Sequence, residues 1–210
     1  MERLCIAMAK GRLAKKAVKL FRQAGYDLPE DMFDSRKLIF TIAAEKLEII
    51  FVKPADVPIY VEYGTADLGI VGKDTLLEEN RDLYEVLDLE YGACKFALAG
   101  LPERKDSLLE RKVATKYPDF TRRYFRALGE PVEIIKLNGS IELAPLTGLA
   151  DTILDIVETG RTLKENGLVV YENIRDLSAR LVVNKVSMKT RQQEISQLIT
   201  ALDQVVNGAD

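Results

Sequence analysis

Short apolar runs of strand length alternate with segments of helical periodicity along these 210 residues, and this alternation constrains the fold more than any other feature. Residues 4–9 are apolar throughout, as expected for a strand that is covered on both faces. From Leu13 to Ala24, apolar residues recur every three or four positions, which predicts a helix that ends at Gly25. The same patterns predict strands at residues 49–52, 68–71, 96–99, 132–135, 168–171 and 181–183, and helices at residues 57–63, 75–79, 120–128, 149–157 and 189–206. We therefore expect an α/β protein with largely parallel sheets.

No flexible linker, repeat or low-complexity tract divides the sequence. Its length is enough for one core or for two small lobes, and two lobes could be joined only by strands that cross between them. We place these crossings near residues 91–95 and 173–180. The prediction is one lobe of residues 1–92 plus 179–210 and a second lobe of residues 93–178.

The composition excludes several kinds of function. The sequence has no histidine, which removes Ser-His-Asp and Cys-His catalytic pairs, imidazole zinc ligands and imidazole proton transfer. Its 30 Lys and Arg against 33 Asp and Glu give a net charge of -3, which argues against nucleic-acid or membrane binding, because both need a concentrated positive field. Cys5 and Cys94 are far apart in apolar segments and are expected to be reduced. We expect a cytoplasmic protein, because residues 1–11 lack a secretory apolar region and no run of about 18 apolar residues occurs.

One segment has the composition of a phosphate-binding loop. It reads Glu158-Thr159-Gly160-Arg161-Thr162 and precedes a short helical pattern. Glycine lets consecutive backbone N–H groups converge, and a helix N-terminus adds positive potential, so the segment could hold a phosphate dianion. Alternatively, Thr159-Gly160 only ends one element, and Thr162 forms a capping box with Glu165. The local sequence leaves both interpretations open.

Two aspartates precede this segment. If residues 149–157 form a helix, Asp151 and Asp155 lie four positions apart on one face, where like charges cost roughly 0.2–0.5 kcal/mol. A cationic or hydroxyl-rich ligand would relieve this repulsion. A ligand is therefore one explanation of the pair.

A second group of candidates follows the first predicted strand. Lys10-Gly11-Arg12 lies at its carboxyl end, and ligands of open parallel sheets gather at that edge. A lysine and an arginine around a glycine would suit a polyphosphate. The simpler alternative is a turn with two solvated cations.

Further candidates lie at loop-like positions. Gly72 ends the strand predicted at residues 68–71, and its backbone amide could face a ligand. A plain strand-to-helix turn, followed by a capping box of Thr75 and Glu78, explains the same residues. Arg36 and Lys53 are two isolated cations at loop positions, and either could simply be solvated.

Together, these segments resemble the short form of ATP phosphoribosyltransferase, the enzyme that opens histidine biosynthesis. The resemblance covers nearly the whole chain and is carried by AKGRL at residues 9–13, DSRKL at 34–38, ADLGIVGKD at 66–74, GSIE at 139–142, GLAD at 148–151 and ETGRTL at 158–163. It implies two lobes similar to the type II periplasmic binding proteins, with the active site in the interlobe cleft. The implied reaction transfers the phosphoribosyl group of phosphoribosyl pyrophosphate (PRPP) to N1 of the adenine of ATP, giving phosphoribosyl-ATP and pyrophosphate.

The resemblance also implies a role for each candidate. Residues of the segment from Glu158 to Thr162 would bind the ribose 5′-phosphate, with Asp151 and Asp155 near the ribose hydroxyls. The ATP phosphates or pyrophosphate would meet Lys10, Gly11, Arg12 and Gly72. The catalytic candidates are Arg36, Lys53 and Glu142, of which Glu142 would position the reacting end or a magnesium-bound water. By the same resemblance, relatives often carry Arg where this chain has Lys53. Lys keeps the charge but lacks the bidentate fork, which counts against a leaving-group role for this position.

Cofactor and partners follow from the same resemblance. Mg²⁺ would be bound through the substrate phosphates, with no dedicated protein metal site. A separate regulatory subunit similar to histidyl-tRNA synthetase would form a hetero-octamer with homodimeric catalytic units and would mediate inhibition by histidine. The alternative is a non-catalytic bilobal small-molecule binding protein or effector domain. A purine-salvage phosphoribosyltransferase fits less well, because Leu154 rather than a second acid precedes Asp155.

Overall fold

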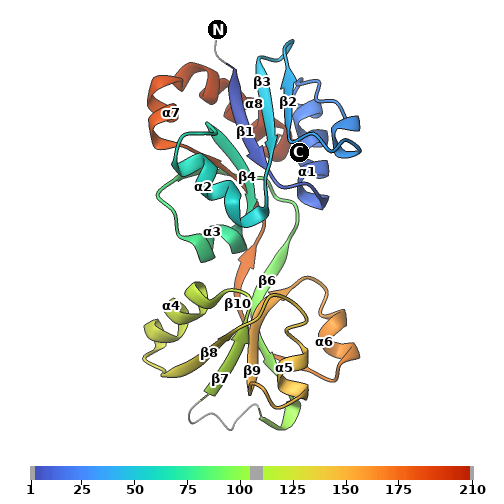
Figure 1. Cartoon of the computed structure of the whole chain (residues 1–210), viewed down its shortest axis with the longest axis vertical. Helices are drawn as coiled ribbons and strands as arrows, with labels where there is room; N and C mark the ends of the chain where they lie inside the picture. Colours follow the sequence, from blue (N-terminus) through green and yellow to red (C-terminus); the bar gives the residue numbers. More distant parts are fainter. Residues whose placement is uncertain (1–2, 105–110, 209–210) are drawn as a thin grey trace. The chain divides into compact units, whose positions relative to one another are not determined.

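The computed structural model describes residues 3–104 and 111–208, and its backbone divides into two compact units (Figure 1). The first unit comprises Met1–Gly92 and Ser178–Asp210, and the second comprises Ala93–Leu177. Each unit has its own sheet and its own apolar core, which confirms the expected α/β class. None of the described helices is long and apolar enough to cross a membrane.

A six-stranded sheet in the order β2-β3-β1-β4-β11-β5 forms the centre of the first unit. Its strands are β1 (Leu4–Met8), β2 (Ile39–Ile42), β3 (Leu47–Phe51), β4 (Leu68–Gly72), β5 (Tyr84–Asp88) and β11 (Ala179–Val183). β1 pairs in parallel with β3 and β4, β2 runs antiparallel to β3, and β11 runs antiparallel to both β4 and β5. Its helices are α1 (Arg12–Gln23), α2 (Val57–Glu62), α3 (Lys73–Glu79), α7 (Lys185–Thr190) and α8 (Gln192–Asn207), with short 3-10 turns η1 (Asp31–Phe33) and η2 (Pro54–Asp56).

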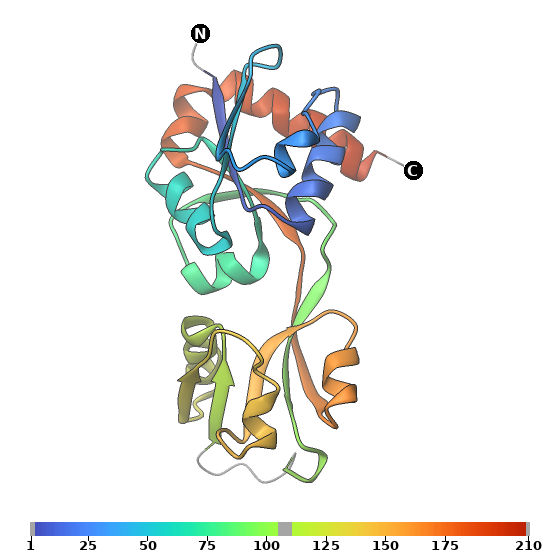
Figure 2. The same ribbon diagram turned by 45° about the vertical axis from the view of Figure 1, so that its right-hand side comes forward.

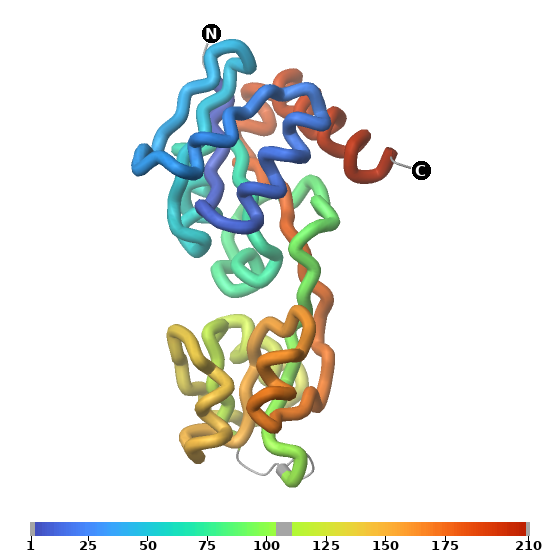
Figure 3. Tube along the Cα trace, turned by 90° about the vertical axis from the view of Figure 1, so that its right-hand side faces the viewer, coloured from blue at the N-terminus to red at the C-terminus, as the bar shows by residue number. Residues whose placement is uncertain are grey.

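Alternate residues of β1 face opposite helical layers, as the pleat of a strand requires. Ile6 belongs to a buried cluster with Phe21 of α1 and Leu198 of α8, and these two helices lie side by side (Figures 2 and 3). Ala7 instead belongs to a cluster with Val57 and other residues on the α2 face. Full burial of a side chain as large as Ile or Phe stabilises by about 1.5–3 kcal/mol, so the two layers together fix the central strand.

A five-stranded sheet in the order β10-β6-β9-β7-β8 forms the centre of the second unit. Its strands are β6 (Cys94–Gly100), β7 (Arg111–Thr115), β8 (Val132–Lys136), β9 (Thr152–Val157) and β10 (Val169–Leu177). β7 is parallel to β8 and β9, whereas β6 is antiparallel to β9 and β10. The helices are α4 (Pro118–Leu128), α5 (Leu143–Leu146) and α6 (Arg161–Glu165), with a 3-10 turn η3 (Pro102–Arg104).

The prediction of largely parallel sheets is wrong. Four strand pairs in the described chain are parallel and five are antiparallel. Each sheet contains three adjacent parallel strands, β3-β1-β4 in the first unit and β9-β7-β8 in the second. Every other described strand pair is antiparallel, including those of β11 in the first sheet and of β10 in the second. Apolar runs alone do not distinguish the two orientations when a strand is buried on both faces.

The helix predicted at residues 149–157 is also wrong, because residues 152–157 form β9. Leu149, Ile153 and Ile156 have helical spacing, yet Thr152, Ile153 and Leu154 are all buried in succession. Three consecutive buried residues are typical of a strand covered on both faces. The segment expected as one terminal helix is two helices, α7 and α8, separated at Arg191.

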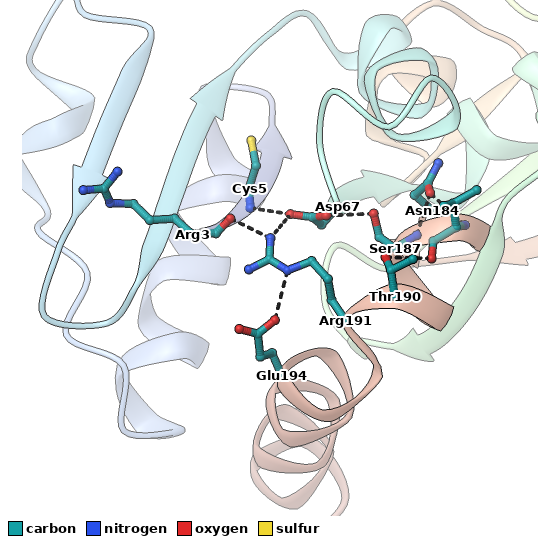
Figure 4. Close-up of polar contacts among 9 residues, drawn as sticks. Arg3, Cys5, Asp67, Asn184, Ser187, Thr190, Arg191 and Glu194 are labelled. Carbon is teal, nitrogen blue, oxygen red and sulfur yellow. Dashed lines mark hydrogen bonds and ion pairs between the residues drawn. The ribbon is translucent and has the colours of Figure 1, made fainter. Parts of the chain in front are cut away.

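Asp67, immediately before β4, joins the C-terminal helices to the central sheet (Figure 4). Its carboxylate accepts hydrogen bonds from the Cys5 backbone N–H at 2.9 Å, the Ser187 hydroxyl at 2.7 Å and Arg191 Nη1 at 2.9 Å. The Asp67 and Arg191 side chains are only 13% and 15% exposed. Burial, followed by the charges of Glu48 and Asp67, raises the pKa of the Cys5 thiol to about 12.

Candidate functional site

The carboxyl ends of three parallel strands, β3, β1 and β4, are adjacent at one edge of the first unit's sheet. Lys53 follows β3, Lys10-Gly11-Arg12 follows β1, and Gly72 is the last residue of β4. Leu38 O accepts a 2.8 Å hydrogen bond from the last residue of β3, which brings the segment of Arg36 to the same edge. Ligands of open α/β sheets bind at such an edge. The first unit therefore brings together all of the site candidates that it contains.

A pocket of about 210 Å³ lies at this edge and is lined in part by Lys10, Gly11, Arg12, Pro54 and Gly72. Gly11 has a φ of 143°, which residues other than glycine rarely adopt. A Cβ atom at this position would meet nothing within 4 Å. The backbone is therefore open to an approaching group. α1 begins at Arg12, with no acidic residue in its first turn and no side-chain cap at Gly11 among the described contacts. The positive end of this 12-residue helix suits an anion.

Lys10 is held by its neighbours rather than fully solvated. Its ammonium group donates to the backbone carbonyl of Ser35 and lies 5.1 Å from the centroid of the Phe51 ring. Ser35 precedes Arg36, whose side chain is exposed, and the exposed Lys53 directly precedes the pocket residue Pro54. Two cationic residues, Lys10 and Arg12, therefore line the pocket, and Arg36 and Lys53 lie in adjoining segments.

Gly72 is the N-cap of α3, which begins at Lys73. The predicted capping box of Thr75 and Glu78 is wrong, because the helix starts three residues earlier than that box requires. A Cβ atom on Gly72 would lie 2.2 Å from Asp74 Oδ1. This oxygen is the end of a side chain that can rotate away, so the contact does not by itself require glycine at this position.

The second unit also gathers its candidates at the carboxyl edge of parallel strands. β8, β7 and β9 are neighbours with one direction, so the loops that follow them share an edge. Glu142 lies in the segment after β8, and Glu158-Thr159-Gly160 follows β9. Lys116, which follows β7 between them, is an exposed cation that the sequence analysis missed. Its position would have identified it if β7 had been predicted as a strand.

The loop after β9 has a left-handed residue at its centre. Gly160 has a φ of 72° and is the N-cap of α6, and Arg161 N–H donates to the Thr159 hydroxyl at 3.4 Å. The capping box of Thr162 and Glu165 does not form, because Glu165 accepts instead from Arg161 Nε at 2.7 Å. α6 has five residues, so its dipole is small, and any phosphate here would depend on the loop amides and hydroxyls.

The two aspartates lie on and before β9 rather than on a helix. One oxygen of Asp151 accepts from the Lys112 backbone N–H at 2.9 Å, and its own N–H donates to Lys112 O, which fixes it to β7. Asp155 Oδ1 accepts from the N–H of Ile156 at 2.8 Å. Asp155 is two residues from the end of β9 and is therefore closer in sequence to the loop than Asp151 is.

A shared core positions the catalytic candidate Glu142 and the loop. Ile141 and Ala144 pack in one buried cluster with Ile153 of β9 and Leu163 of α6. Glu142 is half-buried and is the N-cap of α5. The segments on either side of this edge therefore cannot shift independently without opening that cluster.

The chain is similar in sequence to known proteins of one family. A family model described as HisG: ATP phosphoribosyltransferase matches residues 53–204. The ATP phosphoribosyltransferase of Bacillus subtilis is 56% identical over 205 residues, covering 98% of this chain and 96% of that protein. The enzyme of the same name from Bacillus licheniformis is 55% identical over 205 residues, with coverage of 98% and 96%.

Two solved structures are similar to the whole chain. The ATP phosphoribosyl transferase (HisG:HisZ) complex from Thermotoga maritima has a TM-score of 0.85 and 35% identity, covering 98% of this chain and 99% of that chain. The VFT2 domain of Bordetella pertussis BvgS has a TM-score of 0.58 and 12% identity, covering 100% and 94%, and shows a likeness of fold alone.

Proposed function

The chain belongs to the ATP phosphoribosyltransferase family and acts in the first step of histidine biosynthesis, and from this premise we propose how its two units divide the substrates. The reaction transfers the phosphoribosyl group of PRPP to N1 of the adenine of ATP and releases pyrophosphate. The first unit would hold the ATP phosphates or pyrophosphate, and the second would hold the sugar phosphate. The observation that carries this proposal is the cationic pocket at the amino end of α1.

The chemistry is compatible with a sequence that has no histidine. Adenine N1 is largely unprotonated at neutral pH and can attack the anomeric carbon without a general base. The transition state has oxocarbenium character, so the protein has to align two polyanions and stabilise the leaving group. Fixed cations and backbone N–H groups are sufficient for these tasks.

For the sugar phosphate, we assign the loop residues Glu158-Thr159-Gly160-Arg161-Thr162 to the ribose 5′-phosphate. Asp155 would contact the ribose hydroxyls. We give Asp151 a smaller part, because one of its oxygens already accepts a hydrogen bond from Lys112. Glu142, at the same sheet edge, would position the reacting end of the substrate.

For the other phosphates, we assign Lys10, the Gly11 backbone, Arg12 and the Gly72 turn. Arg36 and Lys53 would stabilise the departing pyrophosphate. Both side chains are exposed. Lys53 follows β3, and Arg36 lies two residues before Leu38, whose carbonyl accepts a hydrogen bond from the end of β3. A lysine at position 53 supplies a point charge rather than a bidentate fork, so its contribution would be mainly Coulombic.

Mg²⁺ would reach the site with the substrates. Among the described residues, no three Cys, Asp or Glu side chains gather into a group that could hold a metal ion. Mg²⁺ commonly binds through substrate phosphates and keeps several waters, so such a protein cage is unnecessary. When bound, the ion would neutralise part of the phosphate charge, while Lys10 and Arg12 orient the phosphates.

We also propose a regulatory partner, in a cytoplasmic hetero-oligomer. Support comes from the Thermotoga maritima structure, which is a complex of HisG with HisZ. A subunit similar to histidyl-tRNA synthetase, assembled with homodimers of this chain into a hetero-octamer, would transmit inhibition by histidine.

The variant Thr159→Ala/Thr162→Ala tests the assignment of the loop. Removing two hydroxyl hydrogen bonds should weaken PRPP binding by about 1–3 kcal/mol and raise the KM for PRPP, with the KM for ATP and the Tm unchanged. The assay is initial-rate formation of phosphoribosyl-ATP with Mg²⁺ and the regulatory subunit present. Thr147→Ala, which removes a hydroxyl bonded only to α5 carbonyls, is the matched control. An unchanged KM for PRPP in the double variant would exclude the loop as the phosphate site.

A further inference from the structure

Five residues of the first unit form a closed ring of polar contacts. Lys73 Nζ pairs with Glu85 Oε2, and Glu85 Oε1 lies 3.3 Å from Arg180 Nη1. Arg180 Nη2 lies 2.6 Å from Asp88 Oδ2, and Asp88 Oδ1 accepts from the Ser178 hydroxyl at 2.7 Å. The Ser178 carbonyl then accepts from the Lys73 backbone N–H at 2.9 Å, which closes the ring.

The ring adjoins two residues that line the pocket of the first unit. Lys73 directly follows the pocket residue Gly72, and Arg180 pairs with Val71, another pocket residue, in the register of β11 and β4. The ring draws on β5, β11 and the start of α3. Its charged side chains are partly buried, with Lys73 15% exposed and Arg180 21% exposed. Partial burial strengthens such contacts relative to those at a fully solvated surface.

Both polar groups of Lys73 that could reach a phosphate are already used within the ring. Its ammonium pairs with a carboxylate, and its N–H donates to Ser178. Lys73 is therefore a poor phosphate ligand in this arrangement, although it follows the glycine turn. The contacts instead fix the backbone of the Gly72 turn from two directions.

We propose that Glu85 is a positioning residue for the ATP or pyrophosphate pocket, acting through Lys73 and Arg180. The inference rests on the proposed function of that pocket. Glu85 is the one ring member that contacts two cations, so it holds the turn after β4 against β11. Ser178, where the chain re-enters the first unit, belongs to the same ring, so the position of the turn also depends on this residue.

The variant Glu85→Gln separates positioning from simple electrostatics. It removes a negative charge near an anion pocket, so electrostatics alone would tighten phosphate binding. Loss of positioning should instead weaken it, and we expect the Kd for inorganic pyrophosphate to rise about fivefold, with a similar rise in the KM for ATP and no change in the KM for PRPP. The Kd would be measured by titration calorimetry with Mg²⁺ on the full chain.

Two further variants complete the test. Ser178→Ala opens the ring without changing the charge and should raise the Kd for pyrophosphate about twofold. Glu30→Gln removes an ion pair with Arg22 that lies outside the ring, and it should leave the Kd unchanged. An unchanged or lower Kd in Glu85→Gln, with wild-type binding intact, overturns the positioning role alone. Absence of pyrophosphate binding by the wild type would overturn the pocket assignment and the inference with it.

Discussion

Replacing Asp67 by Asn tests the connection between the C-terminal helices and the sheet of the first unit. The carboxylate accepts hydrogen bonds from Cys5 N–H, the Ser187 hydroxyl and Arg191 Nη1. An amide offers one acceptor oxygen and an NH₂ group in place of the second oxygen. With its oxygen toward Cys5 and Arg191, the amide turns its NH₂ group to the Ser187 hydroxyl, which can accept instead of donate. The main loss is therefore the negative charge beside a mostly buried guanidinium.

The structure sets the size of the effect. Removing one partner of a buried ion pair costs about 3–5 kcal/mol. Arg191 retains the carbonyl of Arg3 at 2.7 Å and Glu194 at 2.9 Å, and neither Asp67 nor Arg191 is completely buried. We therefore expect a loss of about 2–4 kcal/mol in the free energy of unfolding.

A double-mutant cycle with Arg191→Met measures the pair itself. Urea unfolding followed by circular dichroism would be compared for the wild type, both single variants and Asp67→Asn/Arg191→Met. The double variant should lose less stability than the sum of the singles by about 1–3 kcal/mol, because it leaves neither member of the Asp67–Arg191 pair charged without the other. A coupling below about 0.5 kcal/mol would refute the ion pair as the stabilising contact.

Two other positions give independent tests. Because the pKa of Cys5 is raised to about 12 from an ordinary value of 9.0, the unfolded chain loses the thiol proton first, so the free energy of unfolding should fall as pH rises between these values. Alkaline unfolding of Cys5→Ala should show a shallower decline, and equal slopes would contradict the raised pKa. Gly69→Ala places a Cβ atom 2.8 Å from Val61, 2.9 Å from Val57 and 3.1 Å from Val182, and should cost about 1–3 kcal/mol in urea unfolding. Gly139→Ala, with nothing within 4 Å of the added atom, is the control, and an equal cost in both variants would argue against overpacking.

The sequence predicts buried strands better than exposed ones. The apolar runs at β1, β3, β4, β6 and β11 were located correctly, since each is mostly buried, and β8 was located as well although all its residues are half-buried or exposed. β2 and β5 were missed because their side chains are largely exposed or half-exposed. β9 was mistaken for a helix because Leu149, Ile153 and Ile156 have helical spacing, although Ile156 is exposed in the structure.

The candidate residues were found through their chemistry, whereas their grouping required the topology. Nothing in the order of the sequence shows that Lys53, Lys10 and Gly72 follow three adjacent parallel strands. Lys116 was missed for the same reason. It follows β7, which lies between β8 and β9 in the sheet, and β7 was not predicted. The helical pairing of Asp151 and Asp155 failed for a local reason, since it depended entirely on the wrong element.

The order β4-β11-β5 has a consequence for biosynthesis on the ribosome. Within the described chain β5 pairs only with β11, which comes from residues 179–183, about 90 residues later in the sequence. The second unit, Ala93–Leu177, is synthesised in full before that strand emerges. The inserted unit can therefore fold first, while β4 and β5 await the strand that joins them, and the first half of the protein to be translated is the last to complete its sheet.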